Sequence, residues 1–233
     1  FAAAETCYSM LLGTTRALGD GTGEVRYLNL LGGTLSRRGQ PRKALEYIDL
    51  AYNHPRAKQR DRLQADIARA RALELSRLGR FQEALELLQE SLTVSQEIDD
   101  RLGAGQTLNN MGIAYGRLGV YRQAVELLEQ AYALASTANT NRQLSVGISY
   151  ANALFHLGEI DQLAALLVEL ESLATISKDP ALVRKLRLLS ASEAAARGDA
   201  AEALVALEVL IDEFSNDPTS ESRHLISALN FAS

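Results

Sequence analysis

Five glycines recur along the chain at a nearly constant spacing, and this spacing restricts the possible folds more than any other feature of the sequence. Gly39, Gly79, Gly119, Gly158 and Gly198 are 40, 40, 39 and 40 residues apart. Each follows a stretch in which apolar residues return every three or four positions, as on one face of a helix. A glycine just past a helix end supplies the left-handed backbone that stops the helix. Five such stops predict a solenoid of stacked helix pairs.

Positions at fixed distances from these glycines follow the same period. A small residue precedes each glycine by seven positions, as expected where two helices approach closely, and an aliphatic residue follows it by nine. The small residues are Gly32, Ala72, Gly112, Ala151 and Ala191. The aliphatic residues are Ile48, Leu88, Leu128, Leu167 and Leu207. The 3-and-4 spacing within each repeat predicts one buried stripe per helix.

Composition excludes several classes of protein. Apolar residues make up 47% of the chain, prolines number four, and Ala, Leu, Glu, Arg and Gln dominate, which favours an all-α fold. A net charge of −5 argues against non-specific nucleic-acid binding, which needs clustered cations. No apolar run reaches the roughly 20 residues that span a bilayer, so no membrane partner is expected. The single cysteine, Cys7, excludes an internal disulfide and favours a cytoplasmic setting.

The period also divides the chain. We expect one helical-repeat domain over 1–233, with about 12 helices. Its predicted parts are a half repeat at 1–20, repeats at 24–57, 58–99, 101–138, 140–177 and 179–216, and a half repeat at 217–233. Because the chain starts within a repeat and without Met, we expect it to be a fragment of a longer protein. Its open repeat ends then offer apolar surface for self-association.

The repeat around Gly119 is the best formed. Met111-Gly112-Ile113-Ala114-Tyr115, followed by Gly119, Tyr121, Ala124 and Ala131, resembles the tetratricopeptide repeat, with its L-G-x-x-Y and A-x-x-x-F pattern. Pro41 and Arg71 depart from it, standing where an aromatic and a core apolar residue belong. The period of 40 exceeds the usual 34 or so by nearly two turns of helix per repeat. The sequence is therefore similar to the long-repeat subclass, which includes LGN/Pins scaffolds and the sensor halves of MalT-like regulators.

The resemblance implies a right-handed α-solenoid of antiparallel helix pairs, with the first helix of each pair lining a concave groove. The groove stripe then holds the residues 13, 10, 6, 3 and 2 positions before each turn glycine. From this stripe we select the candidate binding residues Arg26, Asn29, Arg37, Arg69, Arg77, Asn109, Ile113, Arg117, Asn152, Phe155 and His156.

The chemistry of this stripe changes along the chain. Arginines recur in the first three repeats at Arg37, Arg77 and Arg117, and guanidinium groups pair with carboxylates in bidentate fashion. Asn29 and Asn109 can hold the backbone of an extended peptide. The later repeats offer apolar groups, so a partner with an acidic or polar part and an apolar part fits both halves. The alternative for the arginine row is that a cation near a helix C-terminus complements the helix dipole.

No catalytic or metal-binding pattern stands out. The three histidines lack ligand spacing with Cys7 or with one another, and we expect no enzyme activity, metal or cofactor. Cys7 falls near core positions, which predicts a buried thiol. The segments Gly19–Gly23 and His54–Arg62 are interpreted as turns between repeats. The leading hypothesis is a scaffold that binds a protein or peptide segment within a larger regulatory or signalling protein. The alternative is an effector-sensing or oligomerisation domain of a MalT-like bacterial transcriptional regulator.

Overall fold

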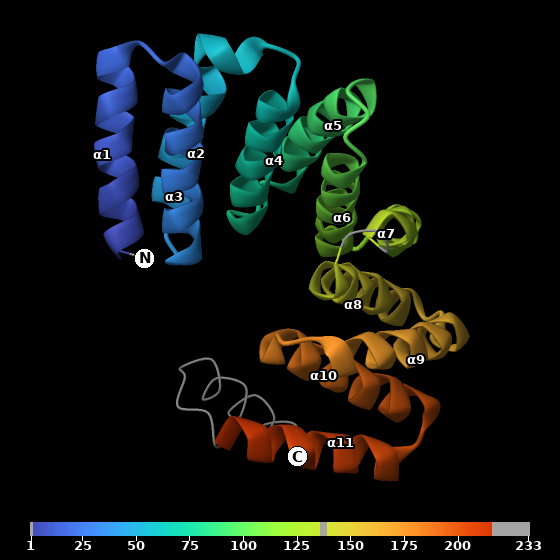
Figure 1. Cartoon of the computed structure of the whole chain (residues 1–233). Helices are drawn as coiled ribbons and strands as arrows, with labels where there is room; N and C mark the ends of the chain where they lie inside the picture. Colours follow the sequence, from blue (N-terminus) through green and yellow to red (C-terminus); the bar gives the residue numbers. More distant parts are fainter. Residues whose placement is uncertain (1, 136–138, 216–233) are drawn as a thin grey trace. The chain divides into compact units, whose positions relative to one another are not determined.

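The computed structural model describes residues 2–135 and 139–215, and these residues form helices joined by short turns (Figure 1). They contain eleven α-helices and one short 3₁₀ helix. The predicted half repeat at 217–233 lies outside the described residues. The chain divides into two compact units, 1–135 and 136–233.

The first unit holds one leading helix and three helix pairs. Its helices are α1 (Ala2–Leu18), α2 (Gly21–Arg37), α3 (Pro41–Asn53), η1 (Pro55–Lys58), α4 (Arg62–Arg77), α5 (Phe81–Glu97), α6 (Arg101–Arg117) and α7 (Tyr121–Ala135). The second unit holds two further pairs in its described part. Its helices are α8 (Thr140–Leu157), α9 (Ile160–Ile176), α10 (Pro180–Arg197) and α11 (Ala200–Ser215).

The turn glycines adopt the backbone that the sequence requires of them. All five have φ between 71° and 87°, the left-handed region in which a Cβ is disfavoured. Side chains close the other ends of the first helices. Asp20, Asp61, Asp100, Asn139 and Asp179 each accept a hydrogen bond from a backbone N–H in the first turn. Of the predicted turn at Gly19–Gly23, Gly19 and Asp20 form the turn, whereas residues 21–23 begin α2, which Asp20 caps.

The small residues seven positions before each glycine lie where the two helices of a pair touch. A Cβ added at Gly32 would stand 2.5 Å from Ile48 Cγ1, and one added at Gly112 would stand 2.5 Å from Leu128 Cγ. Ala72 and Ala151 occupy the same place in other repeats and are fully buried. The predicted close approach is therefore confirmed, and it sets the spacing within each pair.

The first helices of the pairs form one layer of the first unit. The backbones of α2 and α4 lie close together, as do those of α4 and α6. The backbones of the second helices α3, α5 and α7 lie farther apart, and α3 reaches α5 only through long side chains such as Tyr52. An array whose first helices touch along its length curves toward those helices. The free faces of α2, α4 and α6 thus line the concave side of this unit. In the second unit, α8 and α10 contact each other in the same way.

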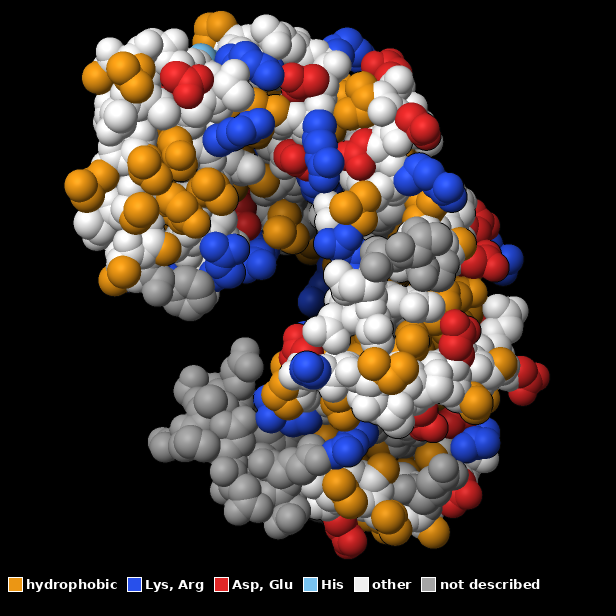
Figure 2. Space-filling model, viewed as in Figure 1, with side chains coloured by type: hydrophobic (Ala, Val, Ile, Leu, Met, Phe, Trp, Pro, Cys, Tyr) orange, Lys and Arg blue, Asp and Glu red, His pale blue; other side chains and the backbone are white. Residues whose placement is uncertain are grey.

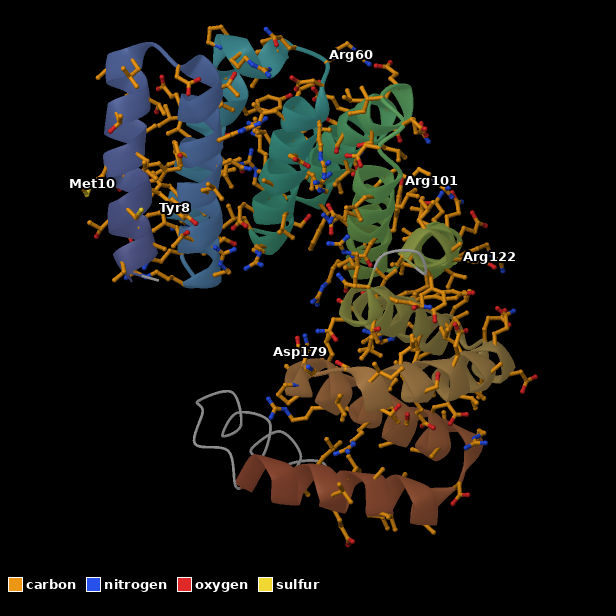
Figure 3. All side chains as sticks on the ribbon, viewed as in Figure 1. Tyr8, Met10, Arg60, Arg101, Arg122 and Asp179 are labelled. Atoms are coloured by element: carbon orange, nitrogen blue, oxygen red, sulfur yellow. The ribbon has the colours of Figure 1, made fainter. Side chains whose placement is uncertain are left out.

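Helix α1 differs from the other second helices because it contacts only α2 among the described elements. Tyr8 points toward α2, where its ring lies 6.4 Å from that of Tyr27, while Met10 points away (Figure 3). Hydrophobic side chains gather over α1 and α2 on the surface (Figure 2), with Met10 and Leu18 more than two-thirds exposed. The prediction of a buried Cys7 was wrong: this thiol is exposed, because it lies on the uncovered side of α1.

Candidate functional site

The concave face of the first unit carries eight of the eleven predicted binding residues. They come from three adjacent first helices, at matching heights in the repeat. Helix α2 provides Arg26, Asn29 and Arg37, α4 provides Arg69 and Arg77, and α6 provides Asn109, Ile113 and Arg117. All eight are exposed or half-buried, so none of them is part of the hydrophobic core.

The position ten residues before the turn glycine is the most informative. It holds Asn29, Arg69 and Asn109 on α2, α4 and α6. Asn109 Oδ1 is buried and accepts no hydrogen bond, and Arg69 Nη1 is buried and donates none. Another nitrogen of Arg69, Nη2, pairs with Asp66 one turn earlier. Neighbouring helices therefore present an acceptor and a donor that the protein itself leaves unsatisfied, at a cost of about 1–3 kcal/mol for each group.

The arginine row two residues before the glycines lies at the C-terminal ends of the same helices. Arg37, Arg77 and Arg117 are all exposed. Arg77 Nε stands 3.6 Å from the Glu74 carboxylate, which is itself 2% exposed. A cation at a helix C-terminus also opposes the partial negative charge there. The row therefore complements the helix ends, and its guanidinium groups are exposed on the concave face.

Glu74 is a residue that the sequence reasoning missed. It lies under the concave face, where Ser36 Oγ donates a 2.6 Å hydrogen bond to its Oε1 atom. Its Oε2 atom is buried without a partner. Burial raises the pKa of this carboxyl, against the opposing effects of the Ser36 hydrogen bond and of Arg77. The signal was a glutamate on an otherwise buried stripe, five residues before Gly79. Glu193 repeats it five residues before Gly198 and pairs with Arg197 at 2.8 Å.

The other three predicted residues lie on α8 in the second unit. Asn152 and His156 are exposed, and Phe155 is half-buried. The Phe155 and His156 rings meet edge to face, 5.6 Å apart. These residues offer a mixed polar and aromatic surface, which is described here for α8 alone.

The basic segment His54–Arg62 is used internally, in agreement with its interpretation as a turn. Arg56 pairs with Asp61 at 2.8 Å and bonds to Thr22, and Arg60 holds Glu97 through two hydrogen bonds. Lys58 lies over the ring of Tyr52. This segment therefore joins the first repeats to one another, and its charges are already matched by carboxylates or by the aromatic ring.

The described residues provide little else that could support chemistry. Within 2–135 and 139–215, no three His, Cys, Asp or Glu side chains gather as a metal site. In the same part of the chain, none of the helices combines the length and the apolar character needed to cross a bilayer.

Comparison with known proteins agrees with this architecture. The family model described as tetratricopeptide repeat matches residues 63–137, which span α4 to α7. This part of the chain therefore matches the tetratricopeptide repeat family, in agreement with the resemblance seen around Gly119. No curated protein sequence matches it.

Solved structures resemble this chain in fold. BtubC from P. vanneervenii is 16% identical, with a TM-score of 0.76 over 98% of this chain and 92% of its own. A structure of nearly identical TPR-like repeats from Podosopora anserina is 20% identical, with a TM-score of 0.68 over 80% and 92%. A Rap protein complexed with Competence and Sporulation Factor is 15% identical, with a TM-score of 0.70 over 89% of this chain and 59% of its own. At these identities the likeness concerns the fold alone.

Proposed function

We propose that the concave face of the first unit binds an extended peptide or protein segment that carries acidic side chains. The observation that carries this proposal is the pair of unsatisfied groups at matching positions, Arg69 Nη1 and Asn109 Oδ1. A peptide backbone offers a carbonyl acceptor and an N–H donor at every residue. A segment lying across α4 and α6 would satisfy both groups, and the binding free energy would include the cost that they impose on the free protein.

The acidic character of the proposed peptide follows from the charges around Arg69 Nη1 and Asn109 Oδ1. The face offers Arg26, Arg37, Arg69, Arg77 and Arg117, five arginines, against the two carboxylates Asp66 and Glu74. Guanidinium groups bind carboxylates through paired hydrogen bonds, which are stronger than neutral ones. Ile113, which is 40% exposed, adds an apolar contact on α6. On α8, Asn152, Phe155 and His156 form a separate candidate contact for a polar and aromatic part of a partner.

The fold supports a binding role in two ways. An open array of helix pairs leaves a long surface on its first helices, with each repeat contacting only its neighbours. One structure of similar fold is a Rap protein complexed with Competence and Sporulation Factor. These points agree with a protein-interaction module, and the acidic segment is our more specific proposal for this chain.

Selection from a library of random peptides displayed on phage tests the proposal. The chain is immobilised, and we expect the recovered sequences to be rich in Asp and Glu. The triple variant R37A/R77A/R117A should bind a recovered peptide at least tenfold more weakly, since each charge-assisted hydrogen bond is worth about 1.5–3 kcal/mol. The control triple R42A/R80A/R122A removes the same charge from the second helices α3 and α7 and from the turn before α5. Equal weakening in both triples would leave only a general charge effect and contradict a site on the concave face.

A further inference from the structure

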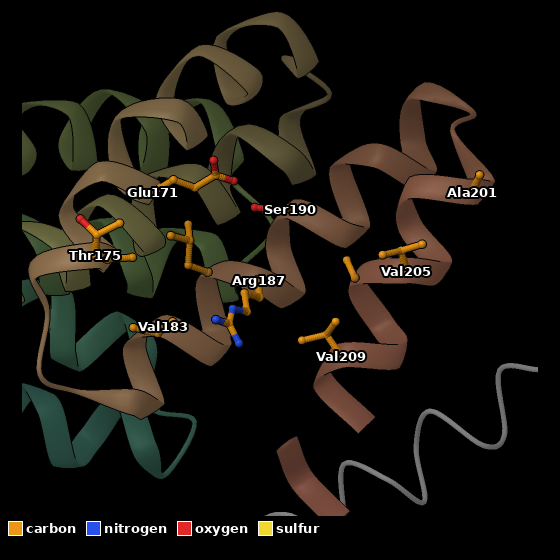
Figure 4. A pocket seen from close by; sticks show the side chains of 11 residues that line it. Glu171, Thr175, Val183, Arg187, Ser190, Ala201, Val205 and Val209 are labelled. Atoms are coloured by element: carbon orange, nitrogen blue, oxygen red, sulfur yellow. The ribbon is translucent and has the colours of Figure 1, made fainter. Parts of the chain in front are cut away.

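The second unit contains a hollow between its second helices. It lies between α9 and α11, with α10 as its floor, and has a volume of about 760 Å³ (Figure 4). Val183, Leu186, Val205 and Val209 supply much of its wall, and alanines of α9 and α11 supply more. This volume falls within the range of about 300–1,000 Å³ that is typical of small-ligand sites.

The equivalent space in the first unit shows why the hollow exists. Between α3 and α5, the ring of Tyr52 fills the slot, with the Arg71 guanidinium 4.6 Å and the Lys58 ammonium 4.8 Å from its centre. The Tyr52 hydroxyl donates a 2.8 Å hydrogen bond to Glu90, which also accepts one from Gln64. The chain thus closes this slot with its own long side chains.

The second unit has other residues at four of these five positions. Counted from the turn glycines, Glu171 stands where Tyr52 does, Val183 where Gln64 does, Ser190 where Arg71 does and Val209 where Glu90 does. All four replacements line the hollow. No ring crosses the space, and valines stand in place of the polar Gln64 and Glu90. The slot is therefore open at repeat positions that the first unit fills with longer side chains.

The charged side chains that line the hollow indicate which class of ligand it would bind. Arg187 lines it and faces Val209 across the gap between α10 and α11 (Figure 4). The equivalent residue of the first unit is Ala68, which is fully buried, so packing of this floor does not require an arginine. Glu171 lies at the other end of the hollow, beside Ser190 (Figure 4), whose Oγ is buried without a partner. The Arg187 guanidinium would attract a carboxylate at one end of the ligand. Glu171 would repel a second negative charge at the other end.

We propose that this hollow binds an apolar monocarboxylate, with its carboxylate at Arg187 and its hydrocarbon body along Val183, Val205 and Val209. This site is separate from the concave face and does not depend on the peptide-binding proposal. The apolar wall supplies affinity through burial of the ligand body, at about 25 cal/mol per Å² removed from water. Arg187 supplies the selectivity for a carboxylate over other polar head groups.

Isothermal titration calorimetry with sodium octanoate tests this site in the whole chain. Octanol and octyltrimethylammonium serve as uncharged and cationic probes of the same chain length. We expect octanoate to bind more tightly than either. R187M should weaken octanoate by about ten- to a hundredfold and leave octanol unchanged, because only the charge-assisted hydrogen bonds are lost.

Two valine-to-tryptophan variants locate the binding. Val205 lines the hollow and Val168 does not, yet both are more than half exposed on neighbouring second helices, so a larger ring is tolerated at either. V205W should reduce octanoate affinity at least tenfold, and V168W should leave it unchanged, with circular dichroism confirming the fold of both. Equal binding by V205W and V168W, equal binding of the three probes, or no binding of octanoate to the unmodified chain would overturn the proposal. A dimer that V205W dissociates, without octanoate binding, would assign the hollow to a second copy instead and overturn it too.

Discussion

Ser36 on α2 and Glu74 on α4 are joined by a 2.6 Å hydrogen bond between two buried side chains, 38 residues apart in sequence. The bond links adjacent first helices directly beneath the concave face, and Glu74 also stands beside Arg77 of the arginine row. The same carboxylate keeps one oxygen unsatisfied. The Ser36–Glu74 bond thus aligns the candidate binding residues on α2 with those on α4, and it does so through a buried carboxyl whose burial costs stability.

Replacing Glu74 by glutamine should stabilise the protein in a pH-dependent manner. Burial raises the pKa of Glu74, so the folded state binds a proton more readily than the unfolded state does. The free energy of unfolding therefore falls as pH rises from the ordinary carboxyl range near about pH 4 through the raised pKa. E74Q lacks this fall but can keep a hydrogen bond to Ser36. Urea denaturation should show its advantage growing from about pH 4 to pH 7, and parallel pH profiles for the two proteins would contradict this.

Gly112→Ala should destabilise the protein by about 1–3 kcal/mol, because the new Cβ would lie 2.5 Å from Leu128 Cγ in a filled contact. Gly116 on the same helix is the matched control, since its Cβ would meet only Ala124 Cβ, at 4.0 Å. G116A should instead stabilise by about 0.5–1 kcal/mol through helix propensity. Thermal unfolding of both variants distinguishes a packing effect from a propensity effect. Similar shifts in Tm would show that the close approach at Gly112 is not required.

Asp99→Gly should raise stability by about 0.5–1 kcal/mol. Asp99 is the one described residue other than glycine with positive φ, at 55°, in the turn between α5 and α6. Gly19 holds the equivalent place in the turn between α1 and α2 with φ of 66°, which shows that the turn accepts glycine. The neighbouring D100A should lower stability by about 1 kcal/mol, because Asp100 caps α6 through the Gly103 N–H. A loss of stability in D99G would mean that the Asp99 side chain contributes more than its backbone costs.

Tyr52→Phe should lower the free energy of unfolding by about 1 kcal/mol through loss of the hydrogen bond to Glu90. Burial raises the pKa of Tyr52, with further contributions from Glu90, so this phenol ionises after an ordinary tyrosine would. Spectrophotometric titration of the eight tyrosines should contain a late component that is missing in Y52F. If the titration curves of Y52F and the unmodified protein differ in amplitude but not in shape, Tyr52 does not lie buried beside Glu90.

The turns and pair contacts could be predicted because their causes are local. A left-handed helix end favours glycine in any repeat, and a small residue such as Gly112 inside a helix indicates a close contact with the other helix of its pair. The buried hydrogen bonds of Glu74 and Tyr52 could not be predicted, because their partners come from other repeats. The sequence of one repeat does not determine how its side chains align with those of the next repeat. The burial of Cys7 was predicted from its spacing to core positions alone. This spacing does not show which side of α1 is covered by a neighbouring helix.

The concave stripe was predicted residue by residue from the family resemblance, and eight of its members lie together on α2, α4 and α6. The sequence could not show that Arg69 and Asn109 leave buried polar atoms without partners, because this depends on how neighbouring side chains pack. That feature, more than the arginine row, distinguishes a binding surface from helix ends that merely carry cations.

The dissociation constant of a selected peptide for Asn109→Ala, measured by fluorescence polarisation, tests the central claim most directly. Asn109 Oδ1 is buried without a partner in the free chain, and in our proposal the peptide supplies its donor. N109A should therefore weaken binding about tenfold, the equivalent of one hydrogen bond near 1.4 kcal/mol. R122A on α7 should leave the constant unchanged, since Arg122 points outward from a second helix (Figure 3). A constant for N109A within about twofold of the unmodified chain, with the fold intact, would contradict peptide binding on the concave face.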